Sequence, residues 1–336
     1  MQENYFELNK QDQKAILKSA SMQLNKTEHV LEKDIWVCWA LEKLFSMPEA
    51  HPMAFKGGTS LSKVYNIINR FSEDIDITLD YRHFDKTFDP FGKNVSNNQM
   101  RKFSDLLKSH VKEYCYNTIV PYFKNELKSL PNSHQYEVKV DDTGEQVWIS
   151  YQSVTAQENK YLKPEILIEF GGRNVIDPNE KHYIEPDVAA ITQGVIYPKT
   201  EAIILSPART FWEKATLIHV ECNRNTFKQN SERLSRHWYD LAKLAAHAWG
   251  QSAINNRVLL ADVIQHKKAF FNTSYANYDA CLIGKFQLIP DEQSLYELYK
   301  DYQQMVVAGM IYEEIDFGEI FDSIFEIEKL INASSL

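Results

Sequence analysis

Apolar residues recur at helical spacing near the start of the chain. In the run EHVLEKDIWVCWALEKLF, residues 28–45, apolar side chains return every three or four positions, which predicts an amphipathic helix with one buried face. This run belongs to a longer stretch, residues 10–47, that we also expect to be helical.

A strand, a turn, a helix and a second strand are predicted next. The apolar segment 52–56 ends at Gly57 and Gly58, after which residues 59–68 regain helical spacing. Residues 74–80, DIDITLD, then alternate polar and apolar side chains, as a half-buried strand does. If the two strands pair in one sheet, the second strand returns beside the glycine turn.

The same sheet is predicted to continue further along the chain. A polar loop over 81–98 and a helix over 100–123 come first. Three strand-like runs follow, at spacings that fit an antiparallel extension of the sheet, over residues 136–140, 146–153 and 165–170.

Helices dominate the remainder. Ser206 followed by Pro207 is typical of a helix start, and the helix is expected to run to about residue 222. Further helices are predicted over 231–249, 293–310 and 318–331. The pattern therefore predicts an α+β fold, with a core domain over 1–205 that includes the N-terminal helices and a helical domain over 206–336.

Composition excludes several classes of protein. The 336 residues are 44% hydrophobic and 25% charged, which argues against disordered and low-complexity chains. Four separated cysteines without a CxxC pair give no zinc-ribbon spacing and no disulfide framework. No signal peptide is evident, and no apolar run approaches the roughly 18–20 residues of a membrane span. We expect a cytoplasmic protein with no membrane partner.

The net charge of −9 is unevenly distributed. Residues 291–336 hold eleven acidic and two basic side chains, so the rest of the chain sums to zero. Residues 209–243, by contrast, hold seven basic and four acidic side chains. A protein that coats nucleic acid everywhere is excluded, but a local anion site is not. We predict that the acidic C-terminal helices face away from the path by which an anionic acceptor would reach such a site, and towards a basic partner.

Two carboxylates carry the most informative chemistry. Asp74 and Asp76 are two residues apart in a predicted strand, so both leave the same face and repel each other unless a cation lies between them or water solvates them. Carboxylate pairs of this kind suit Mg²⁺, which takes one or two carboxylates together with substrate phosphates. In isolation, an Asp-x-Asp pair is more often simply a solvated strand edge.

The turn before the helix is a candidate phosphate site. Gly57 and Gly58 offer backbone N–H groups, and Thr59 and Ser60 add two hydroxyls at a helix start. The alternative is a tight turn in which the two hydroxyls only cap the helix. An anion site beside a divalent-metal site describes the binding of a nucleoside triphosphate.

These residues resemble a known family. The run FKGGTSLSKVY, followed by RFSEDIDI, resembles motif I of the AbiEii/AbiGii nucleotidyltransferase toxin family, within the polymerase-β-like superfamily. LSPARTFWEKATLIH, from residue 205, and SRHWYDL, from residue 235, resemble two further helices of that family. The resemblance spans about residues 30–250 in the expected order. It implies a polymerase-β-like nucleotidyltransferase core, a mixed sheet with flanking helices, followed by a helical domain.

The resemblance also implies roles for individual residues. Asp74 and Asp76 would hold Mg²⁺ or Mn²⁺, and a third carboxylate would come from a neighbouring strand. For this third position we favour Glu169 over Glu165, which shares its strand face. The remaining implied site residues are the catalytic Lys214, as a phosphate-binding charge, the catalytic Asp240, and the nucleotide-binding Lys56, Gly57, Gly58, Thr59, Ser60 and Lys63.

Roles without any part in catalysis would also explain several of these residues. Lys56 could simply be solvated, and Lys63 fits phosphate contact and an exposed face equally well. Asp240 could be a buried partner of Arg236, or it could orient Lys214 or the nucleotide.

The expected function is metal-dependent transfer of a nucleotide from an NTP to an acceptor hydroxyl. By resemblance the acceptor is RNA, at a tRNA 3′ end, and the protein is a toxin held in check by a cognate antitoxin. Two alternatives stand beside this: transfer to a protein hydroxyl by the same site, and a non-catalytic scaffold that binds a nucleotide or a partner.

Overall fold

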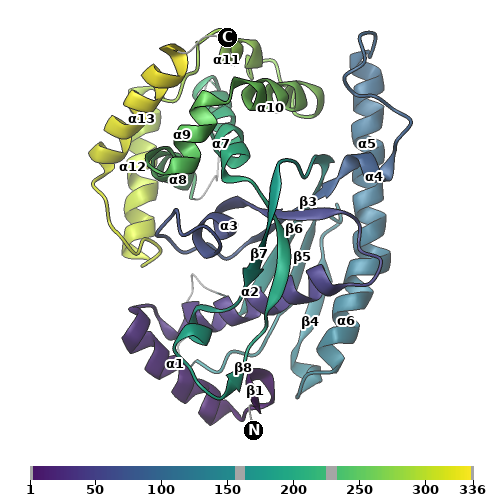
Figure 1. The fold of residues 1–336 in the computed structure, drawn as a ribbon, viewed down its shortest axis with the longest axis vertical. Coiled ribbons are helices and arrows are strands. Elements are labelled where there is room, and N and C mark those ends of the chain that lie inside the picture. Colours follow the sequence, from purple (N-terminus) through teal and green to yellow (C-terminus); the bar gives the residue numbers. More distant parts are fainter. Residues whose placement is uncertain (1–2, 156–162, 225–232, 334–336) are drawn as a thin grey trace. The chain divides into compact units, whose positions relative to one another are not determined.

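The computed structural model describes residues 3–155, 163–224 and 233–333 (Figure 1). The chain forms two compact units. The first comprises Met1–Val64, Glu73–Lys86 and Asp105–Ile204, and the second comprises Tyr65–Ser72, Thr87–Ser104 and Leu205–Leu336. Two segments from the predicted core domain thus belong to the second unit.

Among the described residues, the first unit contains the N-terminal helices and the strands, except for Leu205 at the end of the last strand. Its strands are β1 (Glu3–Asn4), β2 (Met53–Lys56), β3 (Ile75–Asp80), β4 (Glu137–Val140), β5 (Gln146–Ser150), β6 (Glu165–Asn174), β7 (Asn179–Ile184), β8 (Val195–Ile196) and β9 (Thr200–Leu205). Its helices are α1 (Lys10–Leu24), α2 (Glu28–Ser46), α3 (Gly57–Lys63), α4 (Tyr81–Phe84) and α6 (Val120–Lys128). Helix α5 (Asn97–Tyr114) starts in the second unit and meets α6 through a π-helical turn, Cys115–Ile119.

A seven-stranded mixed sheet in the order β4-β5-β6-β3-β2-β9-β7 forms the centre of the first unit. Strand β3 runs antiparallel to β2 and parallel to β6, and β4, β5 and β6 pair antiparallel. This confirms the predicted α+β class, the pairing of the strands on either side of the glycine turn, and the antiparallel extension. Strand β3 forms because Ile75, Ile77 and Leu79 alternate into the core.

Helix α2 buries its apolar face in the first unit, as its periodicity predicts. Thr27 caps its start by accepting a hydrogen bond from the Val30 N–H. Trp36 stacks on Tyr151, with ring centroids 4.7 Å apart, and meets Phe6 edge-on at 4.8 Å. Aromatic packing therefore joins α2 to the N-terminal arm and to the chain that leaves β5.

The helix after the glycine turn is shorter than the pattern predicts. It ends at Lys63, and Asn66 adopts a left-handed φ of 50°. The chain then extends so that Phe71 N–H donates to the Met310 carbonyl at 2.6 Å and Tyr312 N–H donates to the Asn69 carbonyl at 2.9 Å. Long-range pairing inside the second unit overrides the local helical pattern.

The second unit is built on helices α7 (Pro207–Cys222), α8 (Arg236–Ala246), α9 (Ala248–Asn255), α10 (Arg257–Phe270), α11 (Tyr278–Leu282), α12 (Glu292–Val307) and α13 (Phe317–Ala333). Ser206 caps α7 as predicted, its hydroxyl accepting from the Ala208 N–H at 3.3 Å. The helix predicted over 231–249 is instead two helices, because the backbone is extended at His247; residues 231 and 232 lie outside the described residues.

Indole hydrogen bonds fix the core of this unit. Trp212 Nε1 donates to the Ala253 carbonyl at 3.1 Å, and Trp238 Nε1 donates to the Leu288 carbonyl at 2.8 Å. Both indoles are fully buried, so each donor needs such a partner. In the part of the chain that the structure describes, no helix has the length and apolar character needed to cross a membrane.

Candidate functional site

The two predicted metal-binding carboxylates lie at the start of β3, next to the glycine turn. Asp74 directly precedes the strand and Asp76 is its second residue, so their side chains leave the same face. Both side chains are half-buried. Across the sheet, Asp76 is in register with Lys56 of β2 on one side and Glu169 of β6 on the other.

Gly57 meets the carboxylate of Asp76 at close range. Its φ is +80°, and a Cβ atom at this position would lie 1.9 Å from Asp76 Oδ2. No other residue type fits here without displacing the carboxylate. The turn and the carboxylate pair are therefore one packed unit.

The two hydroxyls of the turn are committed to the backbone. Thr59 Oγ1 donates to the Asp74 carbonyl at 2.6 Å, and Ser60 Oγ donates to the Gly57 carbonyl at 2.9 Å. Their residues are only 2% and 0% exposed. The Thr59 hydroxyl thus joins the helix start to the segment that carries Asp74, and the Ser60 hydroxyl bonds within the helix start; nucleotide binding by these two residues stays a prediction.

Glu169 is the carboxylate that the strand register brings beside Asp76. It pairs directly with Asp76, and its Oε1 accepts a hydrogen bond from Gln146 Nε2 at 2.7 Å. Glu165 pairs with Ser150 of β5 and lies before the point where β6 first pairs with β3, at Ile168. The register thus favours Glu169 over Glu165 as the third acidic residue.

The donor set fits a hard divalent cation whose shell the substrate completes. Asp74 and Asp76 are the carboxylate ligands that Mg²⁺ prefers, and Gly57 holds one of them in place. Among the described residues, no group of three or more His, Cys, Asp or Glu side chains is assembled to hold a metal ion. Mg²⁺ needs no such cage, because one or two carboxylates and phosphate oxygens suffice.

Lys63 is buried between two carboxylates rather than exposed. Its Nζ lies 2.7 Å from Asp34 Oδ1 and 2.8 Å from Asp187 Oδ1, and the side chain is 7% exposed. Burial lowers the pKa of Lys63, but the two carboxylates outweigh it and raise the pKa well above its ordinary value. The alternative of an exposed face for Lys63 is therefore wrong, whereas its contact with a nucleotide stays a prediction.

The second unit contains a charged cluster around Asp240. Lys214 Nζ lies 2.7 Å from Asp240 Oδ2, and Arg70 grips the same carboxylate with Nε to Oδ1 and Nη2 to Oδ2, each at 2.7 Å. The partners of Asp240 are thus Arg70 and Lys214 rather than Arg236. Of the alternatives open at the sequence level, the contact with Lys214 is the one found.

The two cations determine the ionisation of this cluster. Burial raises the pKa of Asp240, but Arg70 and Lys214 outweigh burial and hold the pKa well below its usual range. For Lys214, burial and the Arg70 charge together outweigh Asp240 and lower the pKa. Asp240 is therefore a firm anion shared by two cations.

Arg70 was missed as a functional candidate, although it belongs to the run RFSEDIDI. The signal in the sequence was Asp240, at a helix position predicted to be buried, because a buried carboxylate needs a cation as its partner. Spacing within the helix pointed to Arg236 because only local pairs can be read from a sequence. The partner is 170 residues away.

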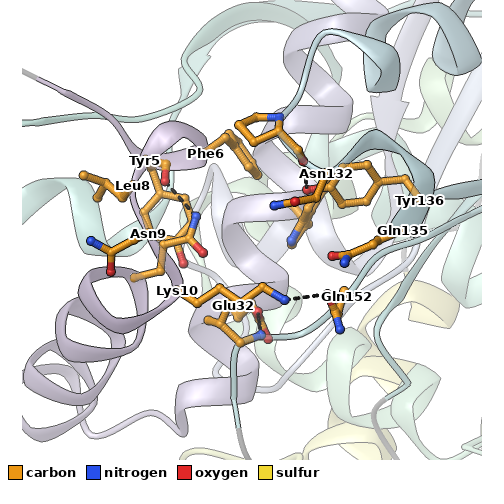
Figure 2. Close-up of a pocket in the computed structure, with 14 residues that line it drawn as sticks. Tyr5, Phe6, Leu8, Asn9, Lys10, Glu32, Asn132, Gln135, Tyr136 and Gln152 are labelled. Carbon is orange, nitrogen blue, oxygen red and sulfur yellow. Dashed lines mark hydrogen bonds between the residues drawn. The ribbon is translucent and has the colours of Figure 1, made fainter.

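A cavity of about 90 Å³ lies elsewhere in the first unit (Figure 2). Its walls combine the N-terminal arm with α2 and the chain around residues 131–136 and 152–154. Lys10 crosses it and donates to Gln152 Oε1 at 2.5 Å. None of the predicted site residues lines it, so it is not part of the carboxylate site.

Comparison with known proteins identifies the family. No curated protein matches the sequence. Among solved structures, similarity was found to "MenT4, nucleotidyltransferase toxin Rv2826c from Mycobacterium tuberculosis H37Rv", with a TM-score of 0.45 and 14% identity over 98% of this chain and 100% of that chain. The family described as "Nucleotidyl transferase AbiEii toxin, Type IV TA system" matches residues 39–324. This chain therefore belongs to the AbiEii nucleotidyltransferase toxin family of type IV toxin–antitoxin systems, as its motifs predict, and is a nucleotidyltransferase.

Proposed function

We propose that this nucleotidyltransferase moves a nucleoside monophosphate from an NTP to a hydroxyl of RNA, at a tRNA 3′ end, in a reaction that depends on Mg²⁺ or Mn²⁺. The observation that carries the proposal is the alignment of Asp76 with Glu169 on neighbouring strands, beside the turn at Gly57. This places three acidic residues, with Asp74, at one end of β3. The family assignment supplies the reaction class.

In the proposed reaction, the acceptor hydroxyl oxygen forms a bond to the α-phosphorus. The bond from that phosphorus to the oxygen that bridges it to the β-phosphate breaks, and pyrophosphate leaves. Asp74 and Asp76 would hold the divalent metal, whose charge would stabilise the negative charge that develops on the phosphate oxygens. Glu169, oriented by Gln146, accepts the proton of the hydroxyl.

Basic residues have two proposed roles. Lys56, in register with Asp76, contributes a positive charge at the carboxylate end of β3. For Lys214 we propose the role that the family resemblance implies, a cation for the triphosphate. Asp240 orients its ammonium group through the 2.7 Å contact.

Charge distribution supports an RNA acceptor. The excess of three positive charges in the sequence of residues 209–243 favours a phosphate backbone, which a protein hydroxyl acceptor does not require, although Arg209 and Lys243 of this stretch pair with Asp262 and Glu313. A cognate antitoxin is the proposed biological partner, in keeping with the family.

The test is incubation with each labelled NTP, Mg²⁺ or Mn²⁺, and total tRNA. Wild-type protein is expected to label RNA with one preferred NTP, and Asp76→Ala is expected to label nothing. Asp76→Asn serves as the isosteric control, because it keeps the packing against Gly57 and removes the charge. Label on protein instead of RNA would establish the protein-acceptor alternative. Label on neither RNA nor protein, together with unimpaired NTP binding, would support the alternative of a non-catalytic scaffold.

A further inference from the structure

We propose that Arg70 is a positioning residue: it shares the Asp240 carboxylate with Lys214, so that Asp240 does not fully cancel the Lys214 charge and this charge is available to the triphosphate of the substrate. The inference rests on the proposed role of Lys214. It assigns a function to Arg70, which the sequence did not mark as a candidate site residue.

The Arg70 contact is a two-point clamp. Nε and Nη2 donate to the two separate oxygens of Asp240, both at 2.7 Å, in the parallel geometry that makes arginine–carboxylate pairs strong. Nη1 donates to the carbonyl of Phe71 at 3.0 Å, which fixes the guanidinium plane. Arg70 is 3% exposed and Asp240 is fully buried, so water does not screen this pair.

Lys214 keeps hydrogen-bonding capacity that this pairing does not use. Among the described residues its Nζ has one partner, Asp240 Oδ2, whereas an ammonium group has three N–H donors. Two donors therefore remain for a ligand. The side chain is 10% exposed, so the ammonium is largely desolvated without being sealed.

The charges of the three groups do not cancel. Two cations share one carboxylate, which leaves a net charge of +1 in a buried cluster. The positive charge of Arg236 in α8 also acts on Lys214 and lowers its pKa, and burial together with both charges lowers the pKa of His237. Because Asp240 is shared between Arg70 and Lys214, it offsets the Lys214 charge only in part, which favours the binding of an anion at Lys214.

Removal of Arg70 would change what Lys214 can do. Asp240 would then neutralise Lys214 alone, and the pair would have no charge to offer a phosphate. A purely structural role for Arg70, in which it only holds the segment that pairs with residues 310–312, predicts no recovery of triphosphate affinity when the charge of Asp240 is removed as well.

The experiment is a charge cycle with Arg70→Ala, Asp240→Asn and the double variant. Two quantities are measured without turnover: the affinity for inorganic triphosphate, by calorimetry, and the pKa of Lys214, by ¹³C reductive methylation and NMR, with Lys214→Met to assign the signal. We expect Arg70→Ala to weaken triphosphate binding by roughly tenfold to a hundredfold, the range of a charged hydrogen bond. The double variant, which restores the net charge, is expected to recover most of that loss.

The Lys214 pKa is expected to rise in Arg70→Ala, to fall in Asp240→Asn and to return towards the wild-type value in the double variant. Additive losses in the double variant, with no ordered change in the Lys214 pKa, would overturn the proposal. Arg70→Lys keeps the positive charge and loses the paired hydrogen bonds to Asp240, so it replaces Arg70→Ala if that variant does not fold. Its triphosphate affinity should then stay within about threefold of wild type.

Failure of the inference and failure of the proposed function give different results. An unchanged Lys214 pKa in Arg70→Ala, with normal nucleotide transfer by wild type, removes the positioning role alone. An ordered pKa response, with no transfer by wild type, removes the proposed reaction alone.

Discussion

The carboxylate of Asp76 lies against the backbone of Gly57, where a Cβ atom would be 1.9 Å from Oδ2. The glycine is thus required by a side chain on the neighbouring strand as well as by its own φ of +80°. The turn is a tightly filled contact, and this contact restricts where the carboxylate can point.

Gly57→Ala is therefore expected to abolish nucleotide transfer and to lower stability by more than the about 1–2 kcal/mol of a left-handed alanine. Transfer assays and chemical denaturation measure the two effects. Gly194→Ala is the matched control, because Gly194 has the same φ of +80° and a Cβ atom there would meet nothing within 4 Å. Equal effects of the two substitutions would show that backbone strain alone matters.

Glu169→Gln is expected to reduce the rate of transfer by roughly 10²–10⁴-fold, the usual contribution of a general base, while nucleotide affinity changes little. The amide keeps the size of the side chain and its acceptor oxygen for Gln146. Steady-state kinetics separate kcat from KM. Glu165→Gln, on the same strand face, should stay within about twofold of wild type; a larger effect there than at Glu169 would reverse the assignment.

Lys63→Met is expected to destabilise the protein by about 3–5 kcal/mol, because it leaves Asp34 buried without its cation. The affinity of the folded protein for NTP should be unchanged. Urea unfolding and nucleotide titration measure the two quantities. Lys26→Met is the control, since Lys26 binds the same Asp187 from a side chain 29% exposed and should cost about 0–1 kcal/mol. Selective loss of NTP affinity in Lys63→Met would support its predicted role as a phosphate ligand.

Acid is expected to destabilise the protein partly through His51. Burial, followed by the charges of His83 and His110, lowers the pKa of His51 below its ordinary 6.5. Between these two pKa values the unfolded chain therefore binds a proton that the folded chain does not. The contribution of His51 to the free energy of unfolding is thus fully present above about pH 6.5 and is lost as the pH falls towards the pKa of the folded state.

His51→Phe should make stability less dependent on pH between about pH 5 and 7, by up to about 1.4 kcal/mol per pH unit, while the ring contact with Tyr114 is kept. Urea unfolding at several pH values measures this slope. His134→Phe, at an exposed position, is the control. Identical slopes for wild type and His51→Phe would contradict the expectation.

Local patterns predicted the elements that position the carboxylates. The alternation over residues 74–80 and the glycine turn led directly to β3 and α3, and Glu169 could be placed on the correct strand face. Its pairing with Asp76 could not be read from the chain, because register depends on which strands become neighbours in the folded sheet.

Partners of buried charges were the least predictable feature. Lys63 looked like an ordinary basic residue past a glycine turn, and its two carboxylates come from α2 and from residue 187. The acidic C-terminal run similarly conceals local roles. Asp301 accepts hydrogen bonds from the backbone N–H groups of Arg233 and Ser235 at 2.7 Å. This carboxylate therefore caps the start of α8.

The interleaving of the two units restricts how this protein can be divided. Arg70 reaches the second unit from a segment that lies between α3 and β3, both of which belong to the first. A chain cut after residue 205 would strand Arg70 without its carboxylate, and the remaining fragment would carry Asp240 with only Lys214 to neutralise it. The toxin therefore cannot be split at its helical boundary into two autonomous modules, and recombination that exchanges the helical half between relatives must also exchange the short segment around Arg70.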